Sequence, residues 1–153
     1  MLLLNLLLAY LVLRNVVIES QLELRSKYRW GQIVVAALLL IWSAYGGLTD
    51  FADLLFWSLF MMINIMMGTG GLAAKNLVLP GAWFRRTIAF DKITGIQIAA
   101  IPALNQKKRV IVKFGLESRR EINMIFTGTV ATVKAALQKR IGQKVAIEVS
   151  KFQ

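Results

Sequence analysis

The chain has 153 residues, of which 57% are hydrophobic, and its mean hydropathy is +0.59. A soluble domain is usually about 45–50% apolar, so this composition disfavours an ordinary globular protein. The chain contains no cysteine and no histidine, which excludes disulfide frameworks, zinc or haem held by these residues, Ser-His-Asp triads and cysteine proteases. Eight acidic residues leave little material for a carboxylate metal site. We therefore predict no cofactor and no metal.

Charge and hydropathy are distributed unequally along the chain. Residues 1–71 carry four basic and four acidic side chains, whereas residues 72–153 carry fifteen basic and four acidic ones and hold the whole net charge of +11. Such asymmetry points to contact with a membrane or with nucleic acid. We predict a membrane-helical anchor over 1–71 and a basic cytoplasmic domain over 72–153. The glycines at 68–71 lack the Gly-Lys-Ser/Thr of a phosphate loop and are interpreted as a flexible hinge.

The anchor contains three long apolar runs, at residues 1–18, 30–48 and 51–67. Each would extend about 25–28 Å as a helix, close to the roughly 30 Å hydrocarbon core of a bilayer, so about three spans are predicted. A cleaved signal peptide is the rival interpretation of the first run, but a basic start and a small-residue cleavage site are missing. Arg14 lies near the end of this run, where its side chain can extend toward the headgroups.

Short connecting segments predict the orientation of these spans. The segment 19–29 contains three basic residues, whereas the turn at 46–50 contains none. Basic loops remain on the cytoplasmic side of a membrane. We therefore expect a multi-pass protein of the cytoplasmic membrane, with its N-terminus and the 46–50 turn outside and its C-terminal domain inside.

A few polar residues within the apolar runs have alternative interpretations. Asp50 and Asp53 would share one helix face and offer a cation site, but a helix cap with a negative charge in the first turn explains them better. Asn64 is expected to bond to a neighbouring helix rather than to a substrate. So few buried polar groups argue against a transporter.

The second half shows strand-like alternation. Turn residues and period-two patterns predict five strands, at residues 73–79, 83–90, 95–101, 108–114 and 119–126. In the fourth strand, alternation places Val110, Val112 and Phe114 on one face, which is expected to point inward. A helical stripe then predicts a helix over 127–141, capped by Thr127 or Thr129 and ended by Gly142. A last strand is expected over 145–149. The predicted α+β fold is a bent antiparallel sheet packed against one helix.

The stretch LVLPGAWFRRTIAFDKITGI, residues 77–96, resembles the bacterial pleckstrin-homology-like (PH-like) domains of small integral membrane proteins. The resemblance covers roughly residues 72–142 and implies a barrel closed by a C-terminal helix. It also implies binding or scaffolding rather than catalysis. Two features depart from the family: five strands precede the helix where a full barrel has seven, and one strand follows it. A half-barrel, or completion by another chain, is therefore expected.

The basic residues fall into clusters that are candidates for binding. A solvated face is one interpretation; docking on anionic lipid, at about 1 kcal/mol for each cation, is another, and an acidic protein partner is a third. Trp83 and Phe84 are either a membrane-inserting wedge or core residues. The predicted lipid- or partner-binding residues are Trp83, Arg85, Arg86, Lys107, Lys108, Arg109, Arg119 and Arg120. A further basic cluster, Lys134 with residues 139–140, is not among them.

Other functional classes find little support. Basic charge alone gives nonspecific nucleic-acid binding, and no RNA-recognition signature is present. Asp91 and Glu121 have no obvious second member for acid-base work, so an enzyme is not expected. The prediction is a non-catalytic, membrane-anchored scaffold or binding module. The alternative is an accessory or assembly subunit of a larger membrane complex, or a homo-oligomer, held mainly by its transmembrane helices.

Overall fold

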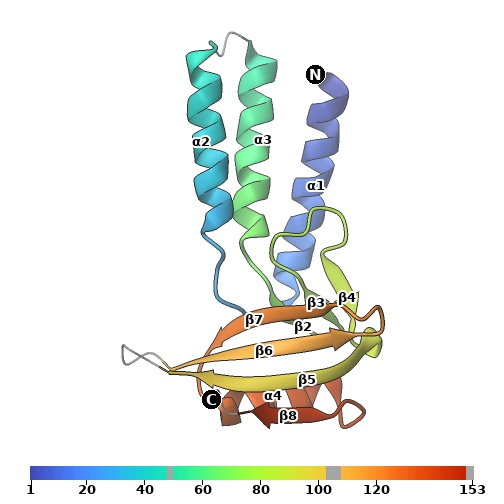
Figure 1. Ribbon diagram of the computed structural model, residues 1–153. Helices are drawn as coiled ribbons and strands as arrows, with labels where there is room; N and C mark the ends of the chain where they lie inside the picture. The colour runs from blue at the N-terminus through green and yellow to red at the C-terminus, as the bar shows by residue number, and fades with distance from the viewer. Residues whose placement is uncertain (48–49, 103–107, 151–153) are drawn as a thin grey trace. The chain divides into compact units, whose positions relative to one another are not determined.

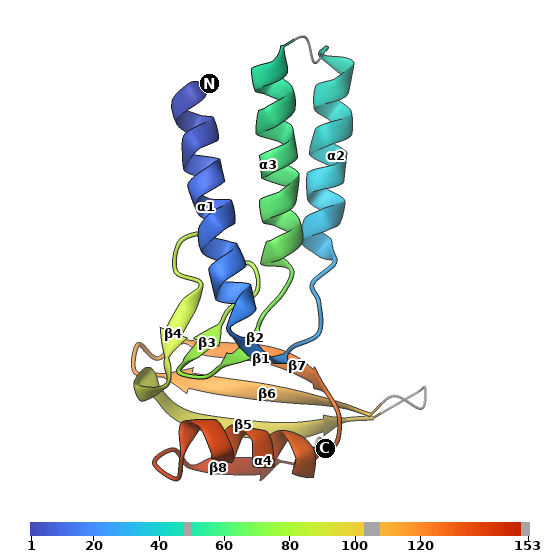
Figure 2. The ribbon, with the colours of Figure 1, turned by 180° about the vertical axis from the view of Figure 1, so that it is seen from behind.

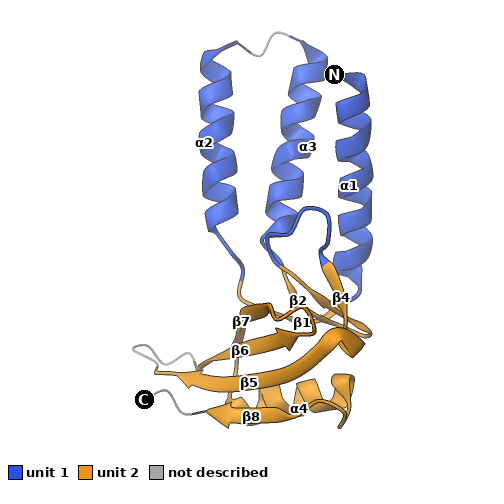
Figure 3. Cartoon of the chain, turned by 45° about the vertical axis from the view of Figure 1, so that its right-hand side comes forward, with its two compact units in different colours: residues 1–21, 28–69, 80–86 blue, residues 22–27, 70–79, 87–153 orange. Residues whose placement is uncertain are grey.

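The computed structural model describes residues 1–47, 50–102 and 108–150, which adopt an α+β fold (Figure 1). Contacts divide the chain into two compact units, coloured separately in Figure 3. The first unit consists of residues 1–21, 28–69 and 80–86, and the second of residues 22–27, 70–79 and 87–153. The chain therefore enters the second unit at residue 22 and does not change over at a single point.

The first unit is built on three helices, α1 (Leu2–Ser20), α2 (Gly31–Tyr45) and α3 (Phe51–Met67), at the places of the three predicted apolar runs. Helix α3 lies between the other two and packs against both (Figures 1 and 2). Within the described residues, α1 is the one helix long and apolar enough to cross a membrane by itself, whereas α2 and α3 are apolar and shorter. The core of the unit lies between α1 and α3 and contains Leu8, Leu11, Val12, Ile63 and Met67.

Polar side chains within these helices bond differently from the sequence prediction. Asn64 donates from Nδ2 to the carbonyl of Phe60 in its own helix at 2.8 Å, because an i−4 carbonyl lies on the same helix face. The amide that joins two helices is Asn5 of α1, which donates to the carbonyl of Ala52 in α3 at 3.1 Å. Asp50 occupies the N-cap position of α3 with an extended backbone, as expected, but its side chain makes no capping hydrogen bond.

The second unit contains a first antiparallel sheet of order β1-β2-β3-β4. Its strands are β1 (Leu22–Arg25), β2 (Gly71–Ala73), β3 (Asn76–Val78) and β4 (Thr87–Ala89). The single strand predicted over 73–79 is wrong, because β2 and β3 form a hairpin there in which Leu72 pairs with Leu77 and both side chains are fully buried. Residues 22–25, predicted to lie in a connecting loop, form β1 and pair with β2.

The second sheet has the order β7-β6-β5-β8 and confirms four of the strand predictions. Its strands are β5 (Ile93–Ile101), β6 (Arg109–Leu116), β7 (Glu121–Thr127) and β8 (Ile147–Ser150), and a short 3-10 turn, Phe90–Lys92, leads into β5. All pairs are antiparallel except β5 with β8, which is parallel, so the sheet is mixed. The predicted inward residues Val110, Val112 and Phe114 are buried.

Helix α4 (Val130–Ile141) covers the core of this unit as the sequence stripe predicted. Val133 and Leu137 are buried against the sheet residues. Thr129 is the N-cap, and its Oγ1 accepts a hydrogen bond from the Thr132 amide at 3.3 Å. Gly142 ends the helix with a φ of 76°, a conformation that glycine adopts without a Cβ clash.

The segment that follows β1 links the two sheets. The amide of Ser26 donates to the carbonyl of Gly70 at 2.8 Å, and the amide of Lys27 donates to the carbonyl of Ile125 in β7 at 2.6 Å. Seven strands thus precede α4 in the part of the chain that the structure describes, instead of the five predicted. The strand predicted over 83–90 is reduced to β4, because residues 80–86 belong to the first unit.

Candidate functional site: the Arg86 cluster and the exposed basic side chains

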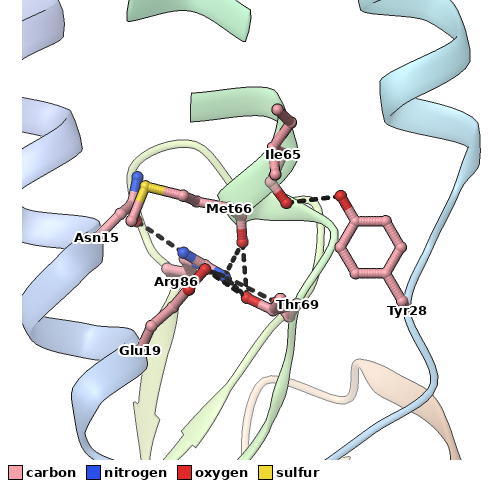
Figure 4. Close-up of polar contacts among 7 residues, drawn as sticks. All are labelled: Asn15, Glu19, Tyr28, Ile65, Met66, Thr69 and Arg86. Carbon is pink, nitrogen blue, oxygen red and sulfur yellow. Dashed lines mark hydrogen bonds and ion pairs between the residues drawn. The ribbon is translucent and has the colours of Figure 1, made fainter. Parts of the chain in front are cut away.

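A completely buried arginine is the centre of the most polar site in the first unit (Figure 4). Arg86 donates from Nη1 to Oδ1 of Asn15 at 2.8 Å. Its Nη2 donates to the carbonyl of Met66 at 2.5 Å, and to the carbonyl and Oγ1 of Thr69 at 2.7 and 2.8 Å. Bonds from a charged donor are stronger than neutral ones. Arg86 therefore binds α1 and the C-terminal end of α3 through one guanidinium.

Glu19 supplies the counter-charge of this arginine. Its Oε1 lies 3.7 Å from Nη2 of Arg86 and accepts a hydrogen bond from Oγ1 of Thr69 at 2.6 Å. We call Asn15, Glu19, Met66, Thr69 and Arg86 the Arg86 cluster. Since the last carbonyls of a helix lack intrahelical donors and attract cations, the cluster acts as a cap for α3.

Tyr28 and Gly68 lie beside the Arg86 cluster. The hydroxyl of Tyr28 donates to the carbonyl of Ile65 at 2.6 Å (Figure 4). A Cβ added to Gly68 would lie 2.2 Å from Cζ of the Tyr28 ring, so a larger residue there would displace the Tyr28 side chain. Burial and the charge of Glu19 both raise the pKa of Tyr28.

Trp83 and Phe84 lie in different surroundings. The Trp83 ring packs against Phe60, with 6.0 Å between ring centroids, and joins the helical core. Its carbonyl accepts a hydrogen bond from Nη2 of Arg14 at 2.7 Å, so Arg14 is bound by protein rather than extended toward the headgroups. Phe84 is 71% exposed, and Arg85 beside it is also exposed.

The predicted basic docking residues do not form one patch. The prediction that Arg86 belongs to a docking surface is wrong, because its side chain is buried in the Arg86 cluster. Lys107 lies outside the described residues. Lys108 and Arg109 are exposed at the start of β6, whereas Arg119 and Arg120 are exposed in the turn after it. Because β6 has eight residues that each rise about 3.3 Å, the two pairs lie roughly 23 Å apart.

Sequence reasoning missed most of the Arg86 cluster, although α1 contained a signal. Asn15 and Glu19 are four residues apart, a spacing that places both on one helix face. Both are polar residues near the C-terminal end of α1, and Asn15 is buried. A polar pair of this kind marks an intramolecular contact. Nothing local to residue 86 indicated that its side chain would meet that pair.

In the Arg86 cluster the acidic side chain and the main-chain carbonyls face the guanidinium. Within the ranges that the structure describes, no group of three acidic, histidine or cysteine side chains is placed to hold a metal. Glu121 lines a shallow pocket of about 250 Å³ together with Lys113 and Glu148. Lys113 and Glu121 lie on the paired strands β6 and β7, where opposite charges attract across the sheet, whereas Glu148 lies on β8.

Comparisons with protein-family models, with curated proteins and with solved structures gave no match. What the structure defines is therefore a class of fold: an α+β chain with an apolar helical unit and a two-sheet unit capped by one helix. The Arg86 cluster is a structural element of the first unit. The exposed basic residues of the second unit are the candidate binding surface.

Proposed function

We propose that this protein is a membrane-anchored, non-catalytic binding module. Its three apolar helices span the cytoplasmic membrane, and its basic second unit is a PH-like domain that docks on anionic lipid headgroups. The proposal rests first on where apolar surface is exposed, next on charge, and then on the order of the strands.

The distribution of exposed apolar side chains carries the proposal. Among the described residues, every exposed large hydrophobic side chain except Val149 belongs to the first unit. Soluble proteins rarely expose contiguous apolar surface of this extent, because water contact with it is unfavourable. A bilayer removes that cost by surrounding the helices with lipid. The second unit, by contrast, buries its apolar residues in one core.

Helix lengths and aromatic positions support three spans. Helices of 19, 15 and 17 residues extend about 28, 23 and 26 Å, so α1 and α3 come close to a hydrocarbon core of roughly 30 Å and α2 is about 7 Å shorter. Local thinning of the bilayer accommodates such a mismatch at modest cost. Trp30 and Trp42 are exposed near the two ends of α2, where interfacial aromatic residues concentrate. The positive-inside rule then places the second unit in the cytoplasm.

Charge supports lipid docking by the second unit. This unit carries fifteen basic and five acidic residues, a net charge of +10, whereas the first unit carries four and three. A cytoplasmic leaflet with anionic lipids attracts each nearby Lys or Arg by about 1 kcal/mol. Several such contacts together suffice to hold a tethered domain against the bilayer.

The number of strands that precede α4 supports the PH-like interpretation. A full barrel of that family has seven strands before its C-terminal helix, and seven strands precede α4 among the described residues. The additional strands relative to the sequence prediction are β1 and the second strand of the β2–β3 hairpin. Strand β8, which follows the helix, remains a departure from the family.

The proposal is tested with the full-length chain in nanodiscs of zwitterionic lipid. These are mixed with phosphatidylglycerol vesicles or with phosphatidylcholine vesicles and separated by flotation. Co-flotation with the anionic vesicles at low salt is expected, with loss in 1 M NaCl because salt screens the attraction. Equal binding to both vesicle types contradicts lipid docking. Absence of vesicle binding together with a stoichiometric acidic protein in the purified sample favours a protein partner.

A matched pair of variants locates the docking surface. K108E/R109E and R119E/R120E make the same charge change at the two ends of β6. The first pair follows Lys107 in the sequence, whereas the second lies between Glu117 and Glu121. We therefore expect K108E/R109E to reduce co-flotation several-fold more than R119E/R120E. Equal effects would indicate that net charge, rather than a defined surface, governs binding.

One observation favours the alternative of an accessory subunit. Helix α2 buries only Ala36, and Leu38, Ile41, Trp42 and Tyr45 line an open apolar groove of about 510 Å³ on it. Such a groove fits a further helix as well as lipid. Purification in a gentle detergent distinguishes the two: a stoichiometric membrane partner that L38A/I41A releases favours the subunit role.

A further inference from the structure

The segment between β3 and β4 leaves the sheet and belongs to the first unit. Residues 80–86, the blue loop in Figure 3, lie beside the C-terminal ends of α1 and α3. Secondary structure in this segment is limited to turns and bends. Its position therefore depends on specific contacts with the helices.

Three contacts anchor the segment to the helices. The amide of Gly81 donates to the carbonyl of Met67 at 2.9 Å. Arg14 of α1 donates to the carbonyl of Trp83, and the side chain of Arg86 is bound within the Arg86 cluster. The start, middle and end of the segment are thus each bonded to the helical unit. Two main-chain groups of the segment, the Gly81 amide and the Trp83 carbonyl, thus have partners in the helical unit.

The contacts of Trp83 measure how far the segment reaches along the helices. Its ring packs against Phe60, which precedes the end of α3 at Met67 by seven residues, or about 10 Å. Its carbonyl is bound by Arg14, which precedes the end of α1 at Ser20 by six residues, or about 9 Å. Two independent contacts therefore place Trp83 at the same level, nearly two helical turns from the helix ends.

We propose that residues 80–86 form a re-entrant loop that enters the membrane and that Phe84 at its tip contacts lipid. This inference rests on the proposed membrane anchoring of α1 and α3. Non-helical backbone is tolerated at membrane depth where protein satisfies its polar groups, as it does here for the Gly81 amide and the Trp83 carbonyl. Phe84 is exposed, whereas Trp83 just before it and Arg86 two residues after it are packed into the helical unit.

The chemistry of the loop tip matches lipid rather than a protein partner. Exposed apolar side chains of α1 and α3 belong to the same unit and are expected to face acyl chains. An aromatic ring next to a cation is typical of the membrane interface, where the ring inserts and the charge reaches a phosphate. Phe84 followed by the exposed Arg85 is such a pair.

The absence of cysteine from the sequence allows a direct test with the full chain. Phe84→Cys and Arg85→Cys are each labelled with the environment-sensitive fluorophore NBD and reconstituted into phosphatidylcholine vesicles. Leu38→Cys on the exposed face of α2 is the lipid control, and Gln138→Cys on the exposed face of α4 is the aqueous control. Each sample is titrated with iodide in water and, separately, prepared with spin-labelled lipid.

The loop inference predicts a graded result. Lipid with a spin label near the top of the acyl chain is expected to quench the label at 84 at least threefold more than the label at 138, with little quenching by iodide. A spin label on the headgroup is expected to quench the label at 85 most. If labels at 84 and 85 both behave like the one at 138 while the label at 38 contacts lipid, the loop inference is overturned and the anchor stands. If the label at 38 is quenched by iodide and not by spin-labelled lipid, the proposed membrane anchoring is itself contradicted.

Discussion

At the scale of single residues, the Arg86 cluster shows how a cation is stabilised inside the first unit. Burying an ion pair yields little net stability, because desolvation offsets much of the attraction. Removing one partner is different, since the other groups are then left buried without it. The amide Nδ2 of Asn15 and Nε of Arg86 already have no hydrogen-bond partner in the described structure. The cluster is therefore sensitive to any further loss.

Arg86→Met is expected to destabilise the protein by about 3–5 kcal/mol, because Glu19 and the carbonyls of Met66 and Thr69 lose their donor. Arg86→Lys keeps the charge but not the planar fork, so an intermediate loss is expected. The measurement is thermal unfolding of the detergent-solubilised chain. Arg85→Met is the matched control at an exposed neighbour, and equal destabilisation by the two methionine variants would contradict a structural role of the cluster.

Tyr28 gives a prediction about alkaline pH. Its pKa in the folded protein is raised above the unfolded value of 10.0 by burial and by Glu19. Above pH 10 the unfolded state therefore holds fewer protons than the folded state, so stability falls as pH rises. Tyr28→Phe removes this contribution and the bond to Ile65. We expect the variant to be less stable at pH 8 but to lose less stability than the parent between pH 9 and 11; parallel curves would refute this.

The sequence predicts single residues well where their burial follows a local period. Val110, Val112 and Phe114 were assigned inward from alternation alone, and all three are buried. Arg86 was assigned to the surface for its charge. Its partner Asn15 is 71 residues away in the sequence, so only the tertiary fold determines that the guanidinium is buried.

At the scale of elements, β1 is the most informative difference between sequence and structure. Leu22-Glu23-Leu24-Arg25 alternates with period two, which is a strand signal, but its basic surroundings favoured a loop assignment. Leu24 packs against the core of the second unit, and Arg140 of α4 binds Glu23 through Nε and Nη2 at 2.8 and 2.7 Å. The helical period of α4 and the alternation of β5 to β7 were predictable because each is long enough to show its repeat.

Gly71 tests the pairing of β1 with β2. A Cβ added to Gly71 would lie 2.0 Å from the carbonyl oxygen of Leu24, and its φ of 144° is unfavourable for other residues. Gly71→Ala is expected to destabilise the protein by about 1–3 kcal/mol. Gly95→Ala in β5 is the control, since nothing lies within 4 Å of its added Cβ. Chemical unfolding compares the two, and an equal response would argue against close β1–β2 packing.

At the scale of the whole molecule, the chain combines an apolar helical unit with a cationic sheet unit. Composition alone predicted this combination, because hydropathy and charge separate along the sequence. It did not predict that residues 22–27 belong to the second unit and residues 80–86 to the first, since each assignment depends on contacts with residues distant in the sequence. The central claim is that α1, α2 and α3 cross the cytoplasmic membrane with the second unit inside.

Cysteine accessibility in intact bacterial cells tests this claim most directly, because the chain has no cysteine of its own. Single cysteines at Gly46 and Asp50, between α2 and α3, and at Lys92 and Lys139 in the second unit, are treated with a membrane-impermeant maleimide before and after lysis. We predict that positions 46 and 50 react in intact cells and that positions 92 and 139 react only after lysis. Reaction of all four positions in intact cells would contradict the account. So would reaction of none of them in intact cells, if the protein is then recovered in the soluble fraction after lysis.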